Sequence, residues 1–501
     1  MRKTPRKGRR SRGFAIILTA LMLTFIVPLV GLAIDGGILY SVRARLSAAS
    51  DAAAMASARA LATGLTIQEQ EASAVARAQA YFAANFPSGS FDTSNPTVGA
   101  VVQEVNLVTR RVTVNAGVTP PVYFMRYLGW GSGSKTLRVN VTGQASRRDI
   151  NLMMVIDRSG SLQTAGACDD LETAAQAFTA LFANQRDRLG LITYGGSYRL
   201  DYAPTKDFKT SPTLNSEIDK LFPGGCSGWT GSAQGLWQGY QQLVTLDEPG
   251  RLNVILFFTD GQPNTVTNDW PLDVNGTPGN SDMTRCYDWE HGKKYNQWGY
   301  DPSNLKYRGY IAQDIGSGNT DGIRGHEANA MPTDDPGKVS IPVGYSGTPK
   351  STSDDCWFRT TNSINSIVER DVPYYPDTDF YGNSMFGFKS VNTWSSGPYS
   401  GKVRYQSGLT GLNASINALD SAALRIRQKV GNPNLTTMIY AIGLGGVGEA
   451  ESDILERVAN DRDSAIFDNN SPEGLYVYAP NPAALNEAFV RIASEILRYS
   501  L

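Results

Sequence analysis

Histidine is scarce in this chain: 501 residues include only His291 and His326. Neither has a cysteine or a second histidine at the spacing of a zinc motif, so a zinc hydrolase lacks its usual ligands. A Ser-His-Asp triad also lacks a histidine in a matching context. We therefore expect a protein that is not an enzyme.

Cysteine is also rare, with four residues at separations of 58, 60 and 70 and no Cys-x-x-Cys pair, which argues against a zinc site. Basic residues outside the first twelve positions are outnumbered, 39 against 47 acidic ones, so the body of the chain has no electrostatic basis for binding nucleic acid. Seven basic residues and no acidic one stand in the short tail: Arg2, Lys3, Arg6, Lys7, Arg9, Arg10 and Arg12.

A long uncharged segment follows this tail, which we take as residues 1–13. Residues 14–34 contain no charged side chain, and 21 helical residues span about 31 Å, enough to cross a bilayer core. The basic tail should stay cytoplasmic and place everything after Asp35 outside the cytoplasm. A cleaved signal peptide is the alternative, but its apolar region is usually shorter and no small-x-small site follows promptly.

Residues 35–147 combine helical and strand patterns. A heptad stripe predicts a helix that packs on a neighbouring chain or, as we favour, on its own domain: Leu39, Val42, Leu46, Ala49, Ala53, Ala56 and Ala60. Residues 67–86 read as a second helix. Alternation at 98–105, 111–116 and 137–145 predicts a small sheet.

From residue 149 to 501, apolar strands alternate with amphipathic helices, the pattern of a doubly wound, mostly parallel α/β sheet. We predict strands at 189–195, 252–259, 435–442 and 474–479, and helices at 170–185, 212–222, 231–246, 409–429, 449–460 and 482–498. The alternation stops at about 262 and resumes after 405. Residues 262–405 are therefore expected to be a loop-like insertion within one domain.

Asp157, Ser159 and Ser161 follow the apolar run Leu152–Ile156 as Asp-x-Ser-x-Ser. Ligands of open α/β sheets bind beyond the carboxyl ends of strands, and hard cations take oxygen ligands. Alone the pattern is weak, because a helix N-cap in a turn has the same composition. A glycine-rich loop carrying Thr230 and a second strand ending in Thr259-Asp260-Gly261 strengthen the metal interpretation.

These three segments together resemble the metal-ion-dependent adhesion site (MIDAS) of von Willebrand factor type A domains, a Rossmann-like fold. The resemblance implies direct or water-mediated ligation of Mg²⁺, with Mn²⁺ or Ca²⁺ as alternatives, by Asp157, Ser159, Ser161, Thr230 and Asp260. It also implies a vacant coordination position that a carboxylate of a protein partner fills.

The amino-terminal region resembles the Tad (tight-adherence) pilus-assembly family, of the TadG-like kind. The resemblance rests on Arg12-Gly13-Phe14, on Asp35-Gly36-Gly37-Ile38-Leu39-Tyr40 and on the alanine-rich segment after Arg45, and it extends through about residue 147. A processed prepilin would carry glutamate five residues after the cleavage glycine, where this chain has Leu18. The resemblance thus implies an uncleaved anchor in a bacterial inner membrane, with the bulk of the chain periplasmic or facing the cell surface.

Four cysteines in an exported chain suggest disulfides, and three connectivities are open. We favour Cys168 with Cys226, which would join two loops expected on the metal face, and Cys286 with Cys356, which would staple the insertion.

The insertion holds five of the eight tryptophans: Trp270, Trp289, Trp298, Trp357 and Trp394. They could form a partner or glycan surface, or, as we favour, a small core of the insertion itself. Its root should lie on the metal face because it begins directly after Asp260.

Two further patterns give only weak support for a ligand site. Gly443, Gly445 and Gly448 match Gly-x-Gly-x-x-Gly, but too late in the chain for a dinucleotide site. Acidic pairs at Asp354-Asp355 and at Asp461 and Asp463 could hold Ca²⁺, although solvated loop carboxylates explain them better.

The expected function is assembly, anchoring or adhesion in a Tad/Flp-type pilus system through a protein partner among the pilus or envelope components. A scaffold whose metal only stabilises loops is the second interpretation. A metal-dependent hydrolase is the third.

Overall fold

A computed structural model describes residues 12–125, 137–221, 226, 228–271, 287–288, 293–294, 300–301, 306–313, 374–404, 409–446 and 452–501. The chain divides into two compact units, Met1–Arg147 with Leu501, and Arg148–Ser500. Each is described by itself.

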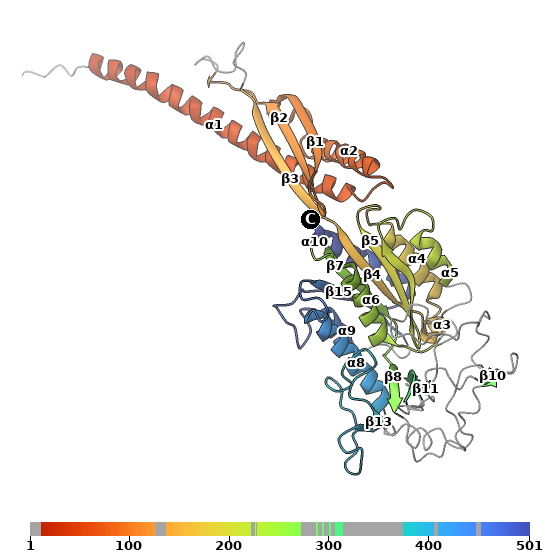
Figure 1. The fold of residues 1–501 in the computed structure, drawn as a ribbon. Helices are drawn as coiled ribbons and strands as arrows, with labels where there is room; N and C mark the ends of the chain where they lie inside the picture. Colours follow the sequence, from red (N-terminus) through yellow and green to blue (C-terminus); the bar gives the residue numbers. More distant parts are fainter. Residues whose placement is uncertain are drawn as a thin grey trace, which may run out of the picture. The chain divides into compact units, whose positions relative to one another are not determined.

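The amino-terminal unit consists of two helices and a three-stranded sheet (Figure 1). The helices are α1 (Arg12–Ala60) and α2 (Ile67–Asn85), and a 3₁₀ turn η1 (Ser90–Asp92) leads into the sheet. The sheet has the order β1 (Ser94–Asn106), β2 (Thr109–Thr119), β3 (Val139–Arg148), with β1 and β2 antiparallel. A capping box between Thr66 and Glu69 fixes the start of α2.

The small-residue stripe of α1 packs inside this unit. Val42, Leu46 and Ala53 are buried in one cluster with Phe82 of α2 and Val114 of β2. The intramolecular interpretation of the stripe is therefore confirmed. Upstream of it the apolar side chains of α1 are exposed, and Ile17–Ala60 includes a stretch long and apolar enough to cross a membrane.

The second unit is built on a six-stranded sheet of order β16-β15-β7-β4-β5-β6. Its strands are β4 (Ile150–Asp157), β5 (Arg188–Tyr194), β6 (Tyr198–Thr205), β7 (Leu252–Thr259), β15 (Thr437–Leu444) and β16 (Leu475–Ala479). All neighbours are parallel except β5 and β6. The sequence prediction missed β6, because its polar residues Arg199 and Asp201 obscure the alternation of an edge strand.

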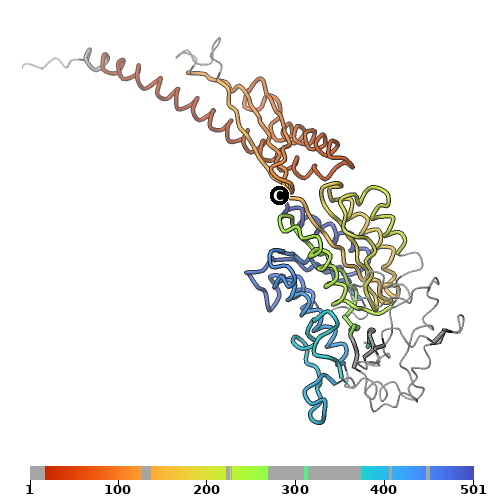
Figure 2. Tube along the Cα trace, in the orientation of Figure 1, coloured from red at the N-terminus to blue at the C-terminus, as the bar shows by residue number. Residues whose placement is uncertain are grey.

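Helices cover both faces of this sheet. Along β4, Met154 packs with α3 (Gly160–Ala165), α4 (Cys168–Thr179), α5 (Leu214–Leu221) and α10 (Leu485–Ser500), which follows the short η5 (Pro482–Ala484). Its neighbours Met153 and Val155 pack with α6 (Ser232–Leu246), α8 (Thr410–Arg427) and α9 (Ser452–Ala459). Successive residues of β4 thus serve opposite cores, which explains its continuous apolar run. The doubly wound, mostly parallel α/β fold is confirmed. Figure 2 shows the Cα trace of the chain in the orientation of Figure 1.

The insertion is rooted in a sheet and not in a loop, which corrects the sequence prediction. Strands β8 (Thr265–Pro271), β12 (Lys306–Ala312) and β11 (Tyr300–Asp301) form an antiparallel sheet of order β11-β12-β8. Two short pairs are also described: β9 (Tyr287–Asp288) with β10 (Lys293–Lys294), and β13 (Tyr374–Tyr375) with β14 (Val403–Arg404). The three consecutive β-branched residues at the start of β8 favour a strand, but the polar composition around them masked this signal. Beyond the insertion, β15 pairs directly with β7, so both belong to one sheet.

Candidate metal centre

Two polar loops meet at the carboxyl ends of the neighbouring central strands β4 and β7. Asp157 is the last residue of β4, and Ser159 and Ser161 lie in the turn that opens α3. Thr259 is the last residue of β7, and Asp260 follows it. Parallel pairing brings both strand ends to the same edge, which is where open α/β sheets bind ligands.

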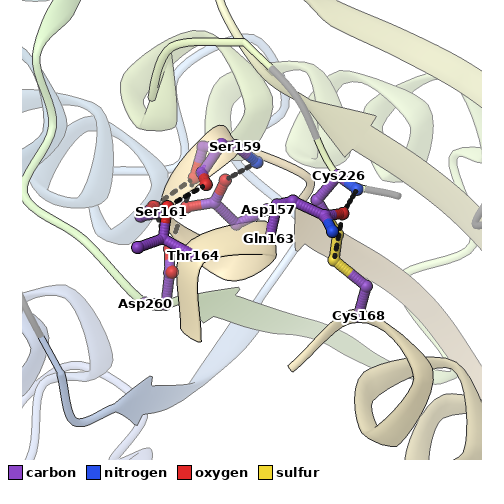
Figure 3. The surroundings of a disulfide bond; sticks show 9 residues. Asp157, Ser159, Ser161, Gln163, Thr164, Cys168, Cys226 and Asp260 are labelled. Carbon is purple, nitrogen blue, oxygen red and sulfur yellow. Dashed lines mark hydrogen bonds between the residues drawn. A yellow bond between two sulfur atoms is a disulfide. The ribbon is translucent and has the colours of Figure 1, made fainter. Parts of the chain in front are cut away.

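Four of the five expected ligands form one connected cluster (Figure 3). The Ser161 hydroxyl donates to Asp260 Oδ1 at 2.8 Å, and the Ser159 hydroxyl lies 3.3 Å from the same oxygen. The two serine oxygens are 2.9 Å apart. Asp157 Oδ1 accepts the Ser159 N–H at 2.8 Å, so the Asp-x-Ser-x-Ser turn is closed on its own carboxylate.

Both carboxylates are buried and face like charge. Burial, followed by the charge of Asp260, raises the pKa of Asp157 above its usual value. Burial also raises the pKa of Asp260. In each case the hydrogen bonds to the carboxylate do not offset the cost of burying its charge, and a divalent cation would offset it.

The donor set at this edge suits a hard cation. Carboxylate and hydroxyl oxygens are the ligands that Mg²⁺ prefers. Within the described ranges, no group of three or more His, Cys, Asp or Glu side chains could hold a metal ion. A cation here would depend on two carboxylates together with hydroxyl oxygens.

Thr230 lies on a third loop that backbone hydrogen bonds hold against the first. Gly160 N–H donates to Gly228 O at 3.0 Å, which ties this loop to the Asp-x-Ser-x-Ser turn. The Thr230 N–H donates to Asn264 Oδ1 at 2.8 Å, and the Asn264 N–H donates to the Thr230 carbonyl oxygen at 3.0 Å. Thr230 is buried and fixed to the root of the insertion, so this root lies beside the loops that follow β4 and β7.

A disulfide joins Cys168 at the start of α4 to Cys226 in the Thr230 loop, with a Cα–Cα distance of 6.2 Å. Gln163 Oε1 accepts the Cys226 N–H at 3.1 Å (Figure 3). The other expected pair, Cys286 and Cys356, lies outside the described residues.

The remaining sequence candidates have structural roles or lie outside the described residues. A side chain at Gly443 would collide with Leu455 of α9, so that glycine serves helix–strand packing. Asp461 accepts the N–H groups of Asp463 in its own loop and of Tyr476 in β16. Trp394 contacts Tyr399 and Arg404 of the insertion. His291, His326, Asp354, Asp355, Trp289, Trp298, Trp357 and Gly448 are not among the described residues, and of Trp270 only the backbone in β8 is.

Two residues of the site were given no role of their own in the sequence analysis. The Thr259 hydroxyl donates to Asp157 Oδ2 at 2.7 Å and so links the two strand ends. Its place directly before Asp260 is a signal that could have identified it. The second, Asn264, acts through a loop 34 residues away, and no local pattern marks that contact.

Two family models match the chain. Residues 152–262 match the von Willebrand factor type A domain, and residues 13–60 match the Flp pilus-assembly TadE/G-like family. A search of the curated proteins found no match.

Solved structures that match this chain include pilus proteins of low identity. The PilB minor pilin from Streptococcus sanguinis is 13% identical, with 82% of this chain and 80% of that chain covered and a TM-score of 0.35. The vWF domain of the type V pili tip protein Mfa5 from Porphyromonas gingivalis is 15% identical, with coverage of 71% and 98% and a TM-score of 0.33. The pilus adhesin SpaC from Lactobacillus rhamnosus GG, in its open conformation, is 13% identical, with coverage of 81% and 34% and a TM-score of 0.33.

The two family matches fall on the two units found in the fold, one on α1 and the other across the strands that carry the candidate metal centre. The chain therefore combines a TadE/G-like amino-terminal region with a von Willebrand factor type A domain, as a TadG-like protein with such a domain does.

Proposed function

We propose that this chain is a non-enzymatic, membrane-anchored envelope protein of a Tad-type pilus system. Its von Willebrand factor type A domain binds a protein partner through a divalent cation, with Mg²⁺ as the expected ion. The cation is held by Asp157, Ser159, Ser161, Thr230 and Asp260.

One observation carries the proposal: two buried carboxylates share an oxygen-lined cluster with two serine hydroxyls, and no lysine or arginine in the described part of the chain forms an ion pair with either carboxylate. Burying unpaired charge is costly, and proteins retain such pairs mainly where a ligand offsets the cost. The direction of the pKa shifts at Asp157 and Asp260 agrees with this.

Some residues would bind the cation, and others position the residues that bind it. Asp157 and Asp260 supply negative charge, and the serine hydroxyls supply neutral oxygens that leave the cation electron-poor. Thr259 and Asn264 keep Asp157 and Thr230 in position. A bound cation would offer a coordination position to a carboxylate of the partner.

Recognition explains the site better than loop stabilisation alone. The three loops are already joined by the Gly160–Gly228 and Thr230–Asn264 hydrogen bonds and by the Cys168–Cys226 disulfide. A cation is therefore not needed to bring them together, and two buried like charges would be a costly way to do so.

The anchor follows from α1. Its exposed apolar amino-terminal half would cross the inner membrane once, with the basic tail in the cytoplasm and the residues after Asp35 outside it.

A photo-cross-linking experiment tests the proposal. Benzophenone-alanine replaces Trp229, a half-buried residue next to Thr230, in the full chain expressed in its native envelope. We expect a cross-linked partner in Mg²⁺ that disappears in a chelator and in Asp260→Asn. The cross-linked partner peptide should carry an aspartate or glutamate whose amide substitution abolishes the adduct.

Asp170→Asn, a change at an exposed carboxylate on α4, is the matched control and should leave the adduct unchanged. An adduct that persists in the chelator and in Asp260→Asn would overturn cation-dependent binding.

A further inference from the structure

The segment after β2 is uncharged and apolar. It reads Pro120, Pro121, Val122, Tyr123, Phe124 and Met125, and we call Tyr123–Met125 the aromatic loop. It belongs to the amino-terminal unit and lies against α1, far along the sequence from the helix that it contacts.

Phe124 packs on α1 at Gly31, where the absence of a side chain leaves room for the ring. A Cβ built at Gly31 would approach the Phe124 ring atoms Cγ and Cδ1 to 2.6 Å, so any side chain there would displace the ring. Gly31 is buried, whereas Val30 and Leu32 beside it are exposed. The aromatic loop thus covers one face of α1 and leaves the others open.

Asp35, one turn further along α1, holds the backbone of the same loop. Its carboxylate accepts the N–H groups of Tyr123 at 3.0 Å, Phe124 at 2.9 Å and Met125 at 2.6 Å. Asp35 is fully buried. Three charge-assisted hydrogen bonds at once satisfy the donors of the loop and most of the acceptor capacity of the carboxylate.

These contacts fix the depth of the loop relative to the apolar part of α1. Gly31 lies inside the uncharged segment 14–34, and Asp35 is the first charged residue after it. A residue four positions before Asp35 is about 6 Å deeper along a helix. If α1 spans the membrane, as proposed above, Phe124 lies where hydrocarbon gives way to headgroups.

The chemistry of the aromatic loop suits that layer. Backbone outside helices is tolerated at membrane depth only when its N–H groups are satisfied by protein, and Asp35 does this for three in succession. Tyrosine and other amphipathic aromatic side chains gather at membrane interfaces. Tyr123 is 44% exposed and Phe124 38% exposed, so both present ring surface beyond their contacts with α1.

We propose that the aromatic loop inserts into the phospholipid interface around the exported end of α1 and sets how deeply that helix sits. The partner is the lipid surface itself. The covalent continuity of the loop's docking site with the membrane-spanning segment favours lipid over a second protein chain as the occupant.

Lipid photolabelling tests this in the full chain. The protein is reconstituted in phosphatidylcholine vesicles that contain a phosphatidylcholine with a diazirine near its glycerol backbone. After illumination, tryptic peptides are searched for lipid adducts. Cleavage at arginine separates the aromatic loop (Val112–Arg126), the apolar segment (Gly13–Arg43) and a control strand (Val139–Arg147).

We expect adducts on the first two peptides and none on the control strand. Gly31→Leu should remove the adduct from Val112–Arg126, because leucine takes the space of the Phe124 ring, and should leave Gly13–Arg43 labelled. Gly36→Leu is the matched control: a Cβ at Gly36 meets no atom within 4 Å, so both adducts should remain.

The outcomes separate this inference from the proposed anchor. Label on Gly13–Arg43 without label on Val112–Arg126 overturns the inference and leaves the anchor standing. Label on neither peptide overturns the anchor and the inference with it. A cross-link from the aromatic loop to a second copy of the chain, in place of lipid, also overturns the inference.

Discussion

Asp157 and Asp260 face each other across two serine hydroxyls, and their buried charges oppose one another. Asp260→Asn keeps the oxygen that accepts from Ser161 but removes one charge. In a chelator we expect the variant to be at least as stable as the wild type, because a repulsion is lost. In Mg²⁺ we expect the wild type to be the more stable of the two proteins.

Thermal unfolding of the full chain in detergent measures this. A cation at about 100 times its dissociation constant adds roughly 2.7 kcal/mol of stability. For a domain of this size that is a rise in midpoint of a few degrees, present in the wild type and absent in the variant. Equal Mg²⁺-induced rises in both proteins would show that the cation binds elsewhere.

Glu248 supports the opposite edge of the same sheet. It contacts Arg188, the first residue of β5, at 3.0 Å and Arg251, the residue before β7, at 2.9 Å. Burial alone would raise the pKa of Glu248, but its hydrogen bonds with Arg188 and the charge of Arg251 outweigh burial and lower it below 4.5. The folded state thus favours the charged form, which adds stability above the usual pKa and loses it as the pH falls through the lowered one.

Glu248→Gln should therefore lower the free energy of unfolding by about 1 kcal/mol at neutral pH, a value typical of partly exposed ion pairs. The difference should vanish in acid below the lowered pKa. Urea unfolding across pH checks this, with the exposed Glu487→Gln as control. A difference that stays constant with pH would exclude the charge as its cause.

At the level of single residues, the sequence brought out those members of the candidate site that stand in a contiguous motif at a strand end. Asp157, Ser159 and Ser161 are recognisable because five consecutive residues supply the pattern. Asn264 is not, because its contact with Thr230 exists only once β8 has folded beside that loop.

Among the elements, β8 begins directly after Asn264, which connects the insertion to the Thr230 loop of the candidate metal centre. Asn264→Ala removes the acceptor of the Thr230 N–H, and outer-sphere partners of metal ligands typically affect cation affinity about 10- to 100-fold. We expect a loss near the lower end of that range with little change in stability. Mg²⁺ titration followed by calorimetry measures it.

Asn470→Ala, at an exposed loop position on the same unit, should leave the affinity unchanged. An unchanged affinity in Asn264→Ala would show that the insertion root does not position Thr230.

The strands that the sequence predicted well are those whose two faces are both covered by helices. β4 and β7 are continuous apolar runs between two helical layers, and the prediction placed β7 at its observed bounds. Edge strands such as β6 and the strands of the insertion mix polar with apolar residues, so tertiary pairing and not local pattern determines them.

At the level of the whole molecule, the cores of the two units draw on separate sets of residues. A fragment of residues 148–501 should therefore fold without α1 and retain the Mg²⁺-dependent rise in thermal stability. Circular dichroism melts with and without a chelator test this. A fragment that shows no cooperative transition would contradict the division into units.

The order of helices and strands gave the doubly wound architecture, because alternation with short connections leaves few topologies for a parallel sheet. It could not give the sheet at the root of the insertion, where β8 pairs with β12 across more than thirty residues of polar sequence.

Direct cation binding is the decisive measurement. Titration of the full chain with Mn²⁺, followed by the electron paramagnetic resonance signal of free Mn²⁺, should reveal one strong site that Mg²⁺ displaces. That site should be absent in Asp260→Asn and present in Asp170→Asn. Equal Mn²⁺ binding by the wild type and Asp260→Asn, or no strong binding by the wild type, would contradict a cation-dependent docking site at the ends of β4 and β7.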